Sequence, residues 1–222
     1  MSLSALFTSC VALEFEDPVD YDGTEVYPVE ASAIANAVPK RRREYAAARI
    51  CARRGLVRLG LPEAPILNAK DRSPLWPSGV VGSITHTDRL AASAVARRLH
   101  CRSLGVDVEP IAALDASIVA KVCTPKERKF VRTRDEYWLA KLIFSAKECF
   151  YKCQYPLSNT YLGFQDVELW IDIARNRYRV ELQRSAGPFS AGQTFEGRFA
   201  LQGDFLVSSM EWGEAFVAER VF

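Results

Sequence analysis

The stretch GVDVEP, residues 105–110, closes the first half of the chain, and we expect the two halves to join near 110–116. Three runs in the first half have the composition of β-strands, over 80–87, 90–97 and 102–109. Alternate side chains of a strand share a face, so we expect Asp107 and Glu109 to point the same way, from Cα atoms ~6.6 Å apart. The first half is therefore predicted to end in antiparallel strands, the last of which carries two carboxylates on one face.

Residues that favour a helix precede these strands. Ala, Arg and Leu dominate 40–61, directly after Pro39, and predict a helix there. An apolar opening over 3–15 and an acidic, turn-rich stretch over 16–25 come before it, and prolines over 62–77 predict an extended connection after it. The first half is thus expected to run helix first, then strands.

The second half repeats this order. Thr124 and Pro125, followed by Glu127, have the pattern of a capping box, and a helical rhythm over 135–154 predicts a long helix that stops before Pro156. Alternating segments predict strands over 164–173, 177–183, 194–201 and 205–211, closed by 215–221. We therefore expect an α+β fold of two similar lobes, 1–110 and 111–222, with any site at their junction.

Composition narrows the classes of function. The 222 residues include 29 Lys plus Arg and 27 Asp plus Glu, a formal net charge of +2, which argues against a protein that coats nucleic acid. Only two histidines are present, His86 and His100, which excludes a multi-histidine metal site. Six scattered cysteines without a C-x-x-C pair disfavour structural zinc and fit packed thiols in a reducing cytoplasm. We expect neither a membrane span nor a secretory signal.

The carboxylates of Asp107 and Glu109 repel each other unless a positive group lies between them. A hard divalent cation such as Mg²⁺ suits this position, because it prefers one or two carboxylates together with waters and phosphate oxygens. The alternative is a solvated strand end, since the D-x-E pattern is common.

A second feature is the segment FSAKECFYK, residues 144–152, on the long predicted helix. The i, i+4 spacing places Glu148 and Lys152 on one face, with Tyr151 beside them. An ordinary surface ion pair is one interpretation. The large apolar neighbours favour another, in which this face forms the wall of a cleft.

The segment GSITH, residues 82–86, ends a predicted strand with hydroxyl groups and a histidine. Ser83, Thr85 and His86 form a group of donors that suits a phosphate oxygen. A structural role for the histidine is the alternative.

Eight basic residues and one acid, Glu44, lie within 40–58. At ~100° per residue, Arg42, Arg49 and Arg53 fall in one stripe next to the apolar face, where they are expected to grip an anionic ligand. Two further cations, Lys70 and Arg72, lie just before PLWP, residues 74–77, and are candidates for additional phosphate contacts.

Four short motifs follow one another along the chain: PLWP, GSITH, GVDVEP and FSAKECFYK. In this order and spacing they resemble the surfactin-type 4′-phosphopantetheinyl transferases, most of all the branch with the enterobactin synthase component D enzymes. The resemblance spans roughly 40–152. It implies two similar α/β lobes related by pseudo-twofold symmetry, each with a helix on a small antiparallel sheet, and an active site at the lobe junction.

The resemblance also implies an activity and its partners. Such enzymes move the phosphopantetheine arm of coenzyme A onto a serine of an acidic apo acyl or peptidyl carrier protein, with release of adenosine 3′,5′-bisphosphate. They require Mg²⁺, which Mn²⁺ can replace. We expect a cytoplasmic monomer that binds neither nucleic acid nor a membrane.

Site residues carry over by motif. The resemblance assigns Mg²⁺ to Asp107, Glu109 and Glu148, and catalysis to Glu148, Lys152 and His86. It assigns coenzyme A to Arg41, Arg49, Thr85, His86, Lys147, Tyr151 and Lys152. Lys70 and Arg72 join this set from their position just before PLWP, in a segment that does not align with the family. The helical stripe favours Arg42 over Arg41, and Glu148 is a candidate for general base as well as for metal ligand, so both questions stay open here.

Two competing functions remain at this point. A non-catalytic module that binds coenzyme A or a nucleotide would explain the basic stripe and His86, but not three carboxylates. A nucleic-acid-binding protein that uses the 40–58 helix is disfavoured, because this helix lacks interleaved aromatic residues. For the carrier protein, we expect docking near 124–133, through Arg128 and Arg132.

Overall fold

The computed structural model describes residues 3–213, and their contacts divide the chain into two compact units. One contains Gly105–Met210 together with residues 3–6, and we call it the 105–210 unit. The other contains Phe7–Leu104 together with residues 211–213, and we call it the 7–104 unit. The chain crosses from the second to the first within one strand, β6 (Cys101–Pro110). Both units mix helices with small antiparallel sheets.

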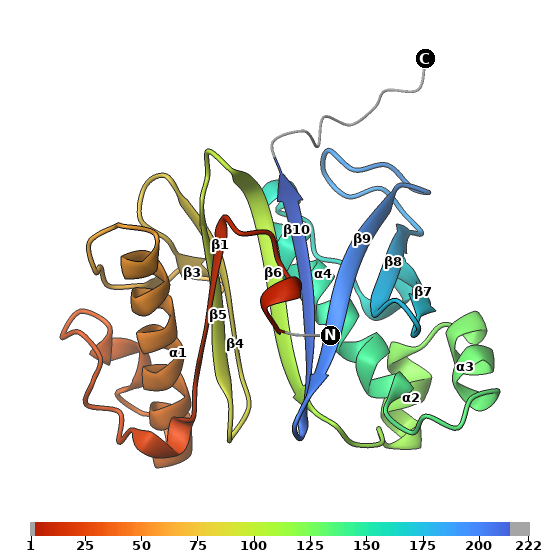
Figure 1. The fold of residues 1–222 in the computed structure, drawn as a ribbon, viewed down its shortest axis with the longest axis horizontal. Helices are drawn as coiled ribbons and strands as arrows, with labels where there is room; N and C mark the ends of the chain where they lie inside the picture. The colour runs from red at the N-terminus through yellow and green to blue at the C-terminus, as the bar shows by residue number, and fades with distance from the viewer. Residues whose placement is uncertain (1–2, 214–222) are drawn as a thin grey trace. The chain divides into compact units, whose positions relative to one another are not determined.

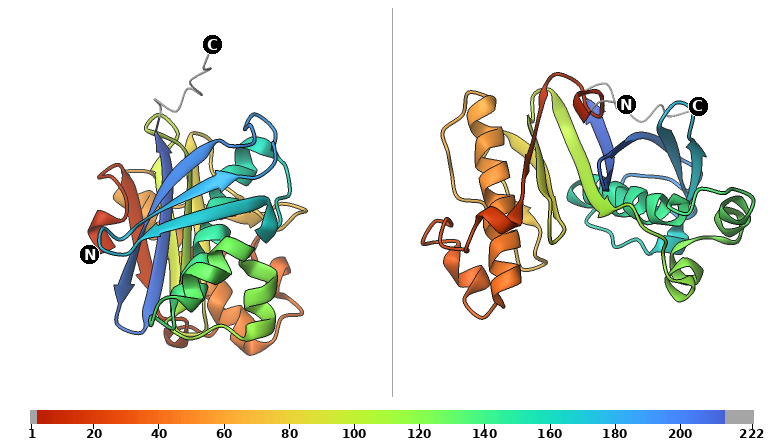
Figure 2. Two further views of the ribbon diagram at one scale, coloured as in Figure 1. Left: turned by 90° about the vertical axis from the view of Figure 1, so that its right-hand side faces the viewer. Right: turned by 60° about the horizontal axis from the view of Figure 1, so that its bottom comes forward.

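The 7–104 unit is a three-stranded sheet covered by one long helix. Its strands are β1 (Val11–Glu16), β4 (Val80–His86) and β5 (Ala91–Arg97), in the antiparallel order β1-β5-β4. Helix α1 (Pro39–Arg58) lies along one face of this sheet (Figure 1 and Figure 2). The helix can approach closely because its buried face consists mainly of small side chains; a Cβ on Gly55 would lie 2.8 Å from the Val95 side chain.

Short elements complete this unit. They are the 3₁₀ turns η2 (Pro18–Asp20) and η3 (Ala31–Ile34) and the two-stranded ribbon β2 (Leu67–Asn68) and β3 (Pro74–Leu75). A further turn, η1 (Leu3–Ala5), belongs to the other unit. The predicted helix and strands of this half are confirmed to within a few residues. The predicted order was wrong, because the apolar opening forms β1, which comes before the helix and pairs with β5.

The 105–210 unit is built on a five-stranded sheet. Besides β6 it contains β7 (Val167–Asp172), β8 (Arg177–Leu182), β9 (Thr194–Gln202) and β10 (Phe205–Gly213), in the order β6-β10-β9-β8-β7. Helix α4 (Leu139–Ser158) packs on it, with the Phe150 and Phe195 ring centroids 5.2 Å apart. A Cβ on Gly105 would lie 2.1 Å from the carbonyl oxygen of Cys149, so only glycine lets β6 lie this close to α4. Shorter elements are α2 (Ala116–Val122), α3 (Pro125–Arg132) and η4 (Phe164–Asp166).

Two helix boundaries test the predictions for this half. The capping box at the start of α3 is confirmed, since Thr124 Oγ1 accepts from the Glu127 N–H and the Glu127 carboxylate accepts from the Thr124 N–H. The predicted end of α4 before Pro156 was wrong. Proline removes one donor from the last turn, but the helix continues to Ser158 and ends where Asn159 takes the left-handed conformation (φ 48°).

Within residues 3–213, helices that are both long and apolar enough to cross a membrane do not occur. The closing segment predicted over 215–221 lies outside the described residues.

Candidate active site

Two side chains on strand β6 and three on helix α4 form a charged cluster in the 105–210 unit. Lys152 donates a hydrogen bond to Asp107 Oδ1 at 2.6 Å and another to the Val106 carbonyl at 3.3 Å. Lys141 donates to Glu109 Oε2 at 3.0 Å. The i, i+4 spacing of Glu148 and Lys152 on α4 was predicted to place them on one face, and each affects the pKa of the other.

The carboxylates of this cluster act on one another. Burial is the main cause that raises the pKa of Glu109, followed by the charge on Asp107. Burial also raises the pKa of Glu148; Lys152 opposes this shift, and Asp107 and Glu109 add to it. For Lys152, burial disfavours the charged form, but Asp107 and Glu148 outweigh burial and raise its pKa. Three carboxyl groups therefore lie near enough to affect one another's pKa, and two of them pair with ammonium groups.

The donor set of this cluster suits a hard cation, because carboxylate oxygens are the ligands that Mg²⁺ prefers. Its geometry is not that of a ready-made metal site. Among residues 3–213, groups of three or more His, Cys, Asp or Glu side chains that could hold a metal ion do not occur. Asp107 and Glu109 instead face Lys152 and Lys141.

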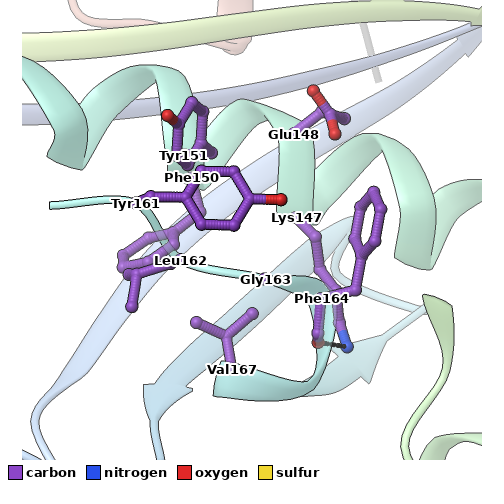
Figure 3. A pocket seen from close by; sticks show the side chains of 9 residues that line it. All are labelled: Lys147, Glu148, Phe150, Tyr151, Tyr161, Leu162, Gly163, Phe164 and Val167. Atoms are coloured by element: carbon purple, nitrogen blue, oxygen red, sulfur yellow. Dashed lines mark hydrogen bonds between the residues drawn. The ribbon is translucent and has the colours of Figure 1, made fainter. Parts of the chain in front are cut away.

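A pocket of about 240 Å³ opens beside α4 in the same unit (Figure 3). Tyr151 and Tyr161 meet edge to face, with ring centroids 5.9 Å apart, and Leu162 and Val167 lie across the pocket from the helix. The remaining lining residues are Lys147, Glu148, Phe150, Gly163 and Phe164. The pocket is thus mainly aromatic and aliphatic, and it adjoins the helix that carries Glu148.

Lys147 lines this pocket with its stem, but its ammonium group points into the unit. The residue is 3% exposed, and Nζ donates to the carbonyls of Val122 and Phe164 and to Glu127 Oε2, all within 2.9 Å. Burial lowers the pKa of Lys147 and raises that of Glu127. Sequence reasoning assigned Glu127 only a capping role and did not foresee this pair, because the two residues come from different helices.

In the 7–104 unit, His86 ends strand β4 beside the first turns of α1. Arg41 Nη1 contacts His86 Nε2, and Glu44 Oε2 lies 3.4 Å from His86 Nδ1 and 3.5 Å from Arg41 Nη1. Thr85 is buried, at 6% exposed. The structure thus brings Arg41 and His86 together, as their joint assignment to one ligand requires.

The arginines of the predicted stripe, Arg42, Arg49 and Arg53, bond to the protein itself. Arg49 is 5% exposed, donates to the Ile66 carbonyl at 2.7 Å and contacts Asn68 Oδ1. Arg53 is 7% exposed and pairs with the buried Glu30 at 3.2 Å. Arg42 donates to backbone carbonyls of the segment before the helix. The helical period predicted that these arginines share a face of α1. It did not predict that this face would contact the protein's own carbonyl and carboxylate groups.

Lys70 and Arg72 lie in the exposed turn between β2 and β3. Arg72 takes a left-handed conformation (φ 70°), and its N–H donates to the Ala69 carbonyl at 2.9 Å. The structure does not bring these two side chains to the Arg41–His86 pair through any hydrogen bond or ion pair among the described residues.

Comparison with known proteins identifies the family. The 4′-phosphopantetheinyl transferase N-terminal domain matches residues 29–96, and the 4′-phosphopantetheinyl transferase superfamily matches 103–201. The 4′-phosphopantetheinyl transferase Svp of Streptomyces mobaraensis is 38% identical, over 94% of this chain and 88% of its own. The chain belongs to the 4′-phosphopantetheinyl transferase superfamily.

Other relatives agree. The 4′-phosphopantetheinyl transferase Npt of Nocardia iowensis is 35% identical, over 85% of this chain and 90% of its own. Enterobactin synthase component D of Escherichia coli O157:H7 is 32% identical, over 71% of this chain and 73% of its own. The family predicted from four short motifs is confirmed, and with it the prediction that the chain is an enzyme.

Proposed function

We propose that this 4′-phosphopantetheinyl transferase moves the phosphopantetheine arm of coenzyme A onto a serine of an apo acyl or peptidyl carrier protein. Adenosine 3′,5′-bisphosphate is the other product. The observation that carries the proposal is the Asp107–Lys152 pair next to Glu148, because it combines negative groups for a cation with a positive group for phosphate. Family membership supports the same reaction.

We assign coenzyme A to two groups of residues, one in each unit. In the 7–104 unit, Arg41 and His86 contact each other and offer cationic and imidazole groups to phosphate oxygens. Arg49, Lys70, Arg72 and Thr85 complete the proposed set there. In the 105–210 unit, the proposed set comprises Lys147, through its stem, and Tyr151, which both line the pocket, together with Lys152, which pairs with Asp107.

Asp107, Glu109 and Glu148 would hold a Mg²⁺ ion, or Mn²⁺ in its place. When bound, such an ion supplies positive charge to the pyrophosphate oxygens. Lys141 and Lys152 pair with two of these carboxylates, so each proposed metal ligand on β6 has an ammonium group beside it.

The chemistry assigned to the chain is mainly electrostatic. The serine oxygen of the carrier forms a bond to the β-phosphorus, the bond from that phosphorus to the oxygen bridging the two phosphates breaks, and the serine proton leaves. Lys152 and His86 stabilise the negative charge that builds on the phosphate oxygens. Glu148 is our candidate for the group that takes the proton, and its raised pKa brings its basicity closer to that need.

The proposal also covers the lobe architecture, the cellular compartment and the pathway. Each unit places a 20-residue helix on an antiparallel sheet, which supports the view of two similar lobes. Five of the six cysteines are buried as free thiols, which supports a reducing compartment such as the cytoplasm. Siderophore biosynthesis is one candidate pathway, given the enterobactin synthase component D relatives.

One assay tests the proposed function. Purified protein, coenzyme A and Mg²⁺ are incubated with several apo carrier proteins, and the carriers are then analysed by intact mass. We expect a gain of one phosphopantetheine, absent when the carrier serine is replaced by alanine. If no carrier gains the arm while coenzyme A still binds, the proposal fails and the non-catalytic binding module is supported instead. Nucleic-acid binding gains no support from α1, because its buried Arg53 pairs with Glu30.

A further inference from the structure

Two of the four sequence motifs contact each other in the 7–104 unit. Trp76, from PLWP, lies against Gly82, from GSITH: a Cβ on Gly82 would lie 2.3 Å from Trp76 Cζ2 and within 2.6 Å of two further ring carbons. Gly82 does not take a left-handed conformation, so its backbone does not require glycine. Glycine is needed at this position because any side chain would occupy the place of the indole ring.

Close packing rather than a hydrogen bond holds this ring in place. Trp76 Nε1 is buried and makes no hydrogen bond within residues 3–213, although a buried indole N–H usually has a partner. The ring packs instead on a cluster of buried side chains, formed by Ala52, Leu56, Ile66, Val80 and Val95. The space that Gly82 leaves therefore decides where the ring lies.

Ile66, which directly precedes strand β2, is held by two buried charged side chains. Its N–H donates to Glu30 Oε1 and its carbonyl accepts from Arg49 Nε, each at 2.7 Å. Glu30 is 1% exposed and Arg49 is 5% exposed. Buried charged groups are costly unless they are paired, and here both direct a hydrogen bond at the backbone of one residue. The chain is thus fixed just before β2, as it is at Trp76 just after β3.

The segment between these two anchors, which we call the 67–75 ribbon, consists of β2, β3 and the turn that carries Lys70 and Arg72. Its strands pair over two residues each, and a two-stranded ribbon is marginally stable by itself. The turn is closed by hydrogen bonds from the Ala69 N–H to the Ser73 carbonyl at 2.8 Å and from the Arg72 N–H to the Ala69 carbonyl at 2.9 Å. The place of the turn in the unit therefore depends on the two anchors.

We infer that Trp76 and Gly82 are positioning residues for coenzyme A binding, because their contact fixes the 67–75 ribbon. The turn of the ribbon then presents its two cations, Lys70 and Arg72, to a phosphate group. This inference rests on the proposed function for the identity of the ligand. A cation that is already in place loses less conformational entropy when the phosphate binds, so the contact raises affinity without touching the ligand.

The first test examines the Trp76–Gly82 contact without ligand. The chain has four tryptophans, and Trp76→Phe identifies the indole ¹H–¹⁵N resonance of Trp76 among them. Gly82→Ala should shift this resonance, because the added methyl group overlaps the ring. Gly213→Ala, where nothing lies within 4 Å of a Cβ, is the matched control and should leave it in place. A Trp76 resonance that does not move in Gly82→Ala would overturn the inference.

The second test measures the Kd for coenzyme A by calorimetry. Replacing both Lys70 and Arg72 with alanine should raise the Kd by about 10- to 100-fold, as expected for lost hydrogen bonds between charged groups. Gly82→Ala should raise it by a similar or smaller factor. In the background of the two alanines, Gly82→Ala should have little further effect, because no cations are left to position. A general disturbance of the unit would instead multiply the two losses.

A compensating change at Trp76 completes the test. Trp76→Phe added to Gly82→Ala should recover part of the lost affinity, since the smaller ring makes room for the methyl group. If Gly82→Ala does not fold, Trp76→Leu takes its place, with the same expectation of non-additive losses.

The inference fails if Gly82→Ala, or the variant without Lys70 and Arg72, binds coenzyme A like the wild type. It also fails if the losses multiply or if the added Trp76→Phe recovers nothing. Binding is measured without a carrier protein, so the inference can fail while transfer to a carrier proceeds. Conversely, a chain that shows the predicted non-additivity but modifies no carrier would contradict the proposed function alone.

Discussion

At the scale of single residues, charged side chains in the 105–210 unit are of two kinds. Lys126 and Glu168 lie 2.8 Å apart with the lysine exposed, and Lys147 and Glu127 lie 2.8 Å apart with both side chains almost fully buried. Equal distances do not imply equal energies, because water screens the first pair and not the second.

The variant Lys147→Met should unfold at a lower urea concentration than the wild type, because Glu127 is left buried without its ammonium partner. We expect a loss of about 3–5 kcal/mol in the free energy of unfolding, measured by urea titration. Lys126→Met is the control and should have a much smaller effect. Adding Glu127→Leu to Lys147→Met should recover part of the loss; a double variant no better than the single one would contradict this account.

Glu148 is either a base or only a ligand, and one substitution separates these roles. In Glu148→Gln we expect transfer to fall by about 10²- to 10⁴-fold, while the Kd for coenzyme A changes much less. Glu196→Gln, an exposed carboxylate on β9, is the control. Equal losses of transfer and of coenzyme A binding would show that Glu148 acts only as a ligand.

At the scale of elements, helix α4 and strand β6 hold the charged cluster together by close approach. The distance depends on Gly105, since any side chain there would meet the Cys149 backbone. The Lys152–Asp107 bond joins these same two elements, so their spacing and the chemistry of the site are coupled.

Gly105→Ala should therefore reduce both stability and transfer. We expect a loss of about 1–3 kcal/mol in the free energy of unfolding, as is typical for overpacking, together with a lower kcat. Gly213→Ala in β10 is the matched control, because nothing lies within 4 Å of a Cβ there. A Gly105→Ala protein with the stability and activity of the wild type would show that the two elements can separate without cost.

A second element, helix α3, is the docking site that we propose for an acidic carrier protein. Arg128 and Arg132 lie on this capped helix, and Arg132 is exposed. Changing both to Glu should raise the KM for the carrier and leave the Kd for coenzyme A unchanged, because like charges then face each other. Arg175→Glu, an exposed change on the β7–β8 turn, is the control. An unchanged carrier KM would rule out this surface.

At the scale of the whole molecule, both units bury cysteine thiols in apolar surroundings. Burial raises the pKa of Cys51 and Cys101 in the 7–104 unit to about 12, and likewise that of Cys149 in the 105–210 unit. For Cys123 burial raises it to about 11. These thiols stay protonated in the folded chain at pH values where an unfolded chain ionises.

Stability should consequently fall above about pH 9, the ordinary range of a thiol pKa. The folded state binds more protons than the unfolded state there, so each such thiol lowers the free energy of unfolding by up to about 1.4 kcal/mol per pH unit. Urea titrations under reducing conditions at several pH values from 8 to about 11 would measure this slope. Cys51→Ala and Cys101→Ala should each make this slope shallower by the contribution of one thiol. Slopes identical to that of the wild type would contradict the prediction.

Much of this molecule follows from local patterns. The helical period placed Arg49 and Arg53 on one face of α1, and the strand period placed Asp107 and Glu109 on one face of β6. The capping box at Thr124 and the four ordered motifs were also readable, because each depends on residues that are near one another in the chain.

Contacts between distant residues required the tertiary structure. Lys152 reaches Asp107 across 45 positions and Arg41 reaches His86 across another 45, and nothing in the spacing of either pair indicates the contact. The same holds for Arg49 and Arg53, whose shared face could meet either a ligand or the protein's own carbonyl and carboxylate groups. Periodicity shows which side chains share a face, but only the folded chain determines what that face meets, because packing and desolvation depend on every neighbouring element at once.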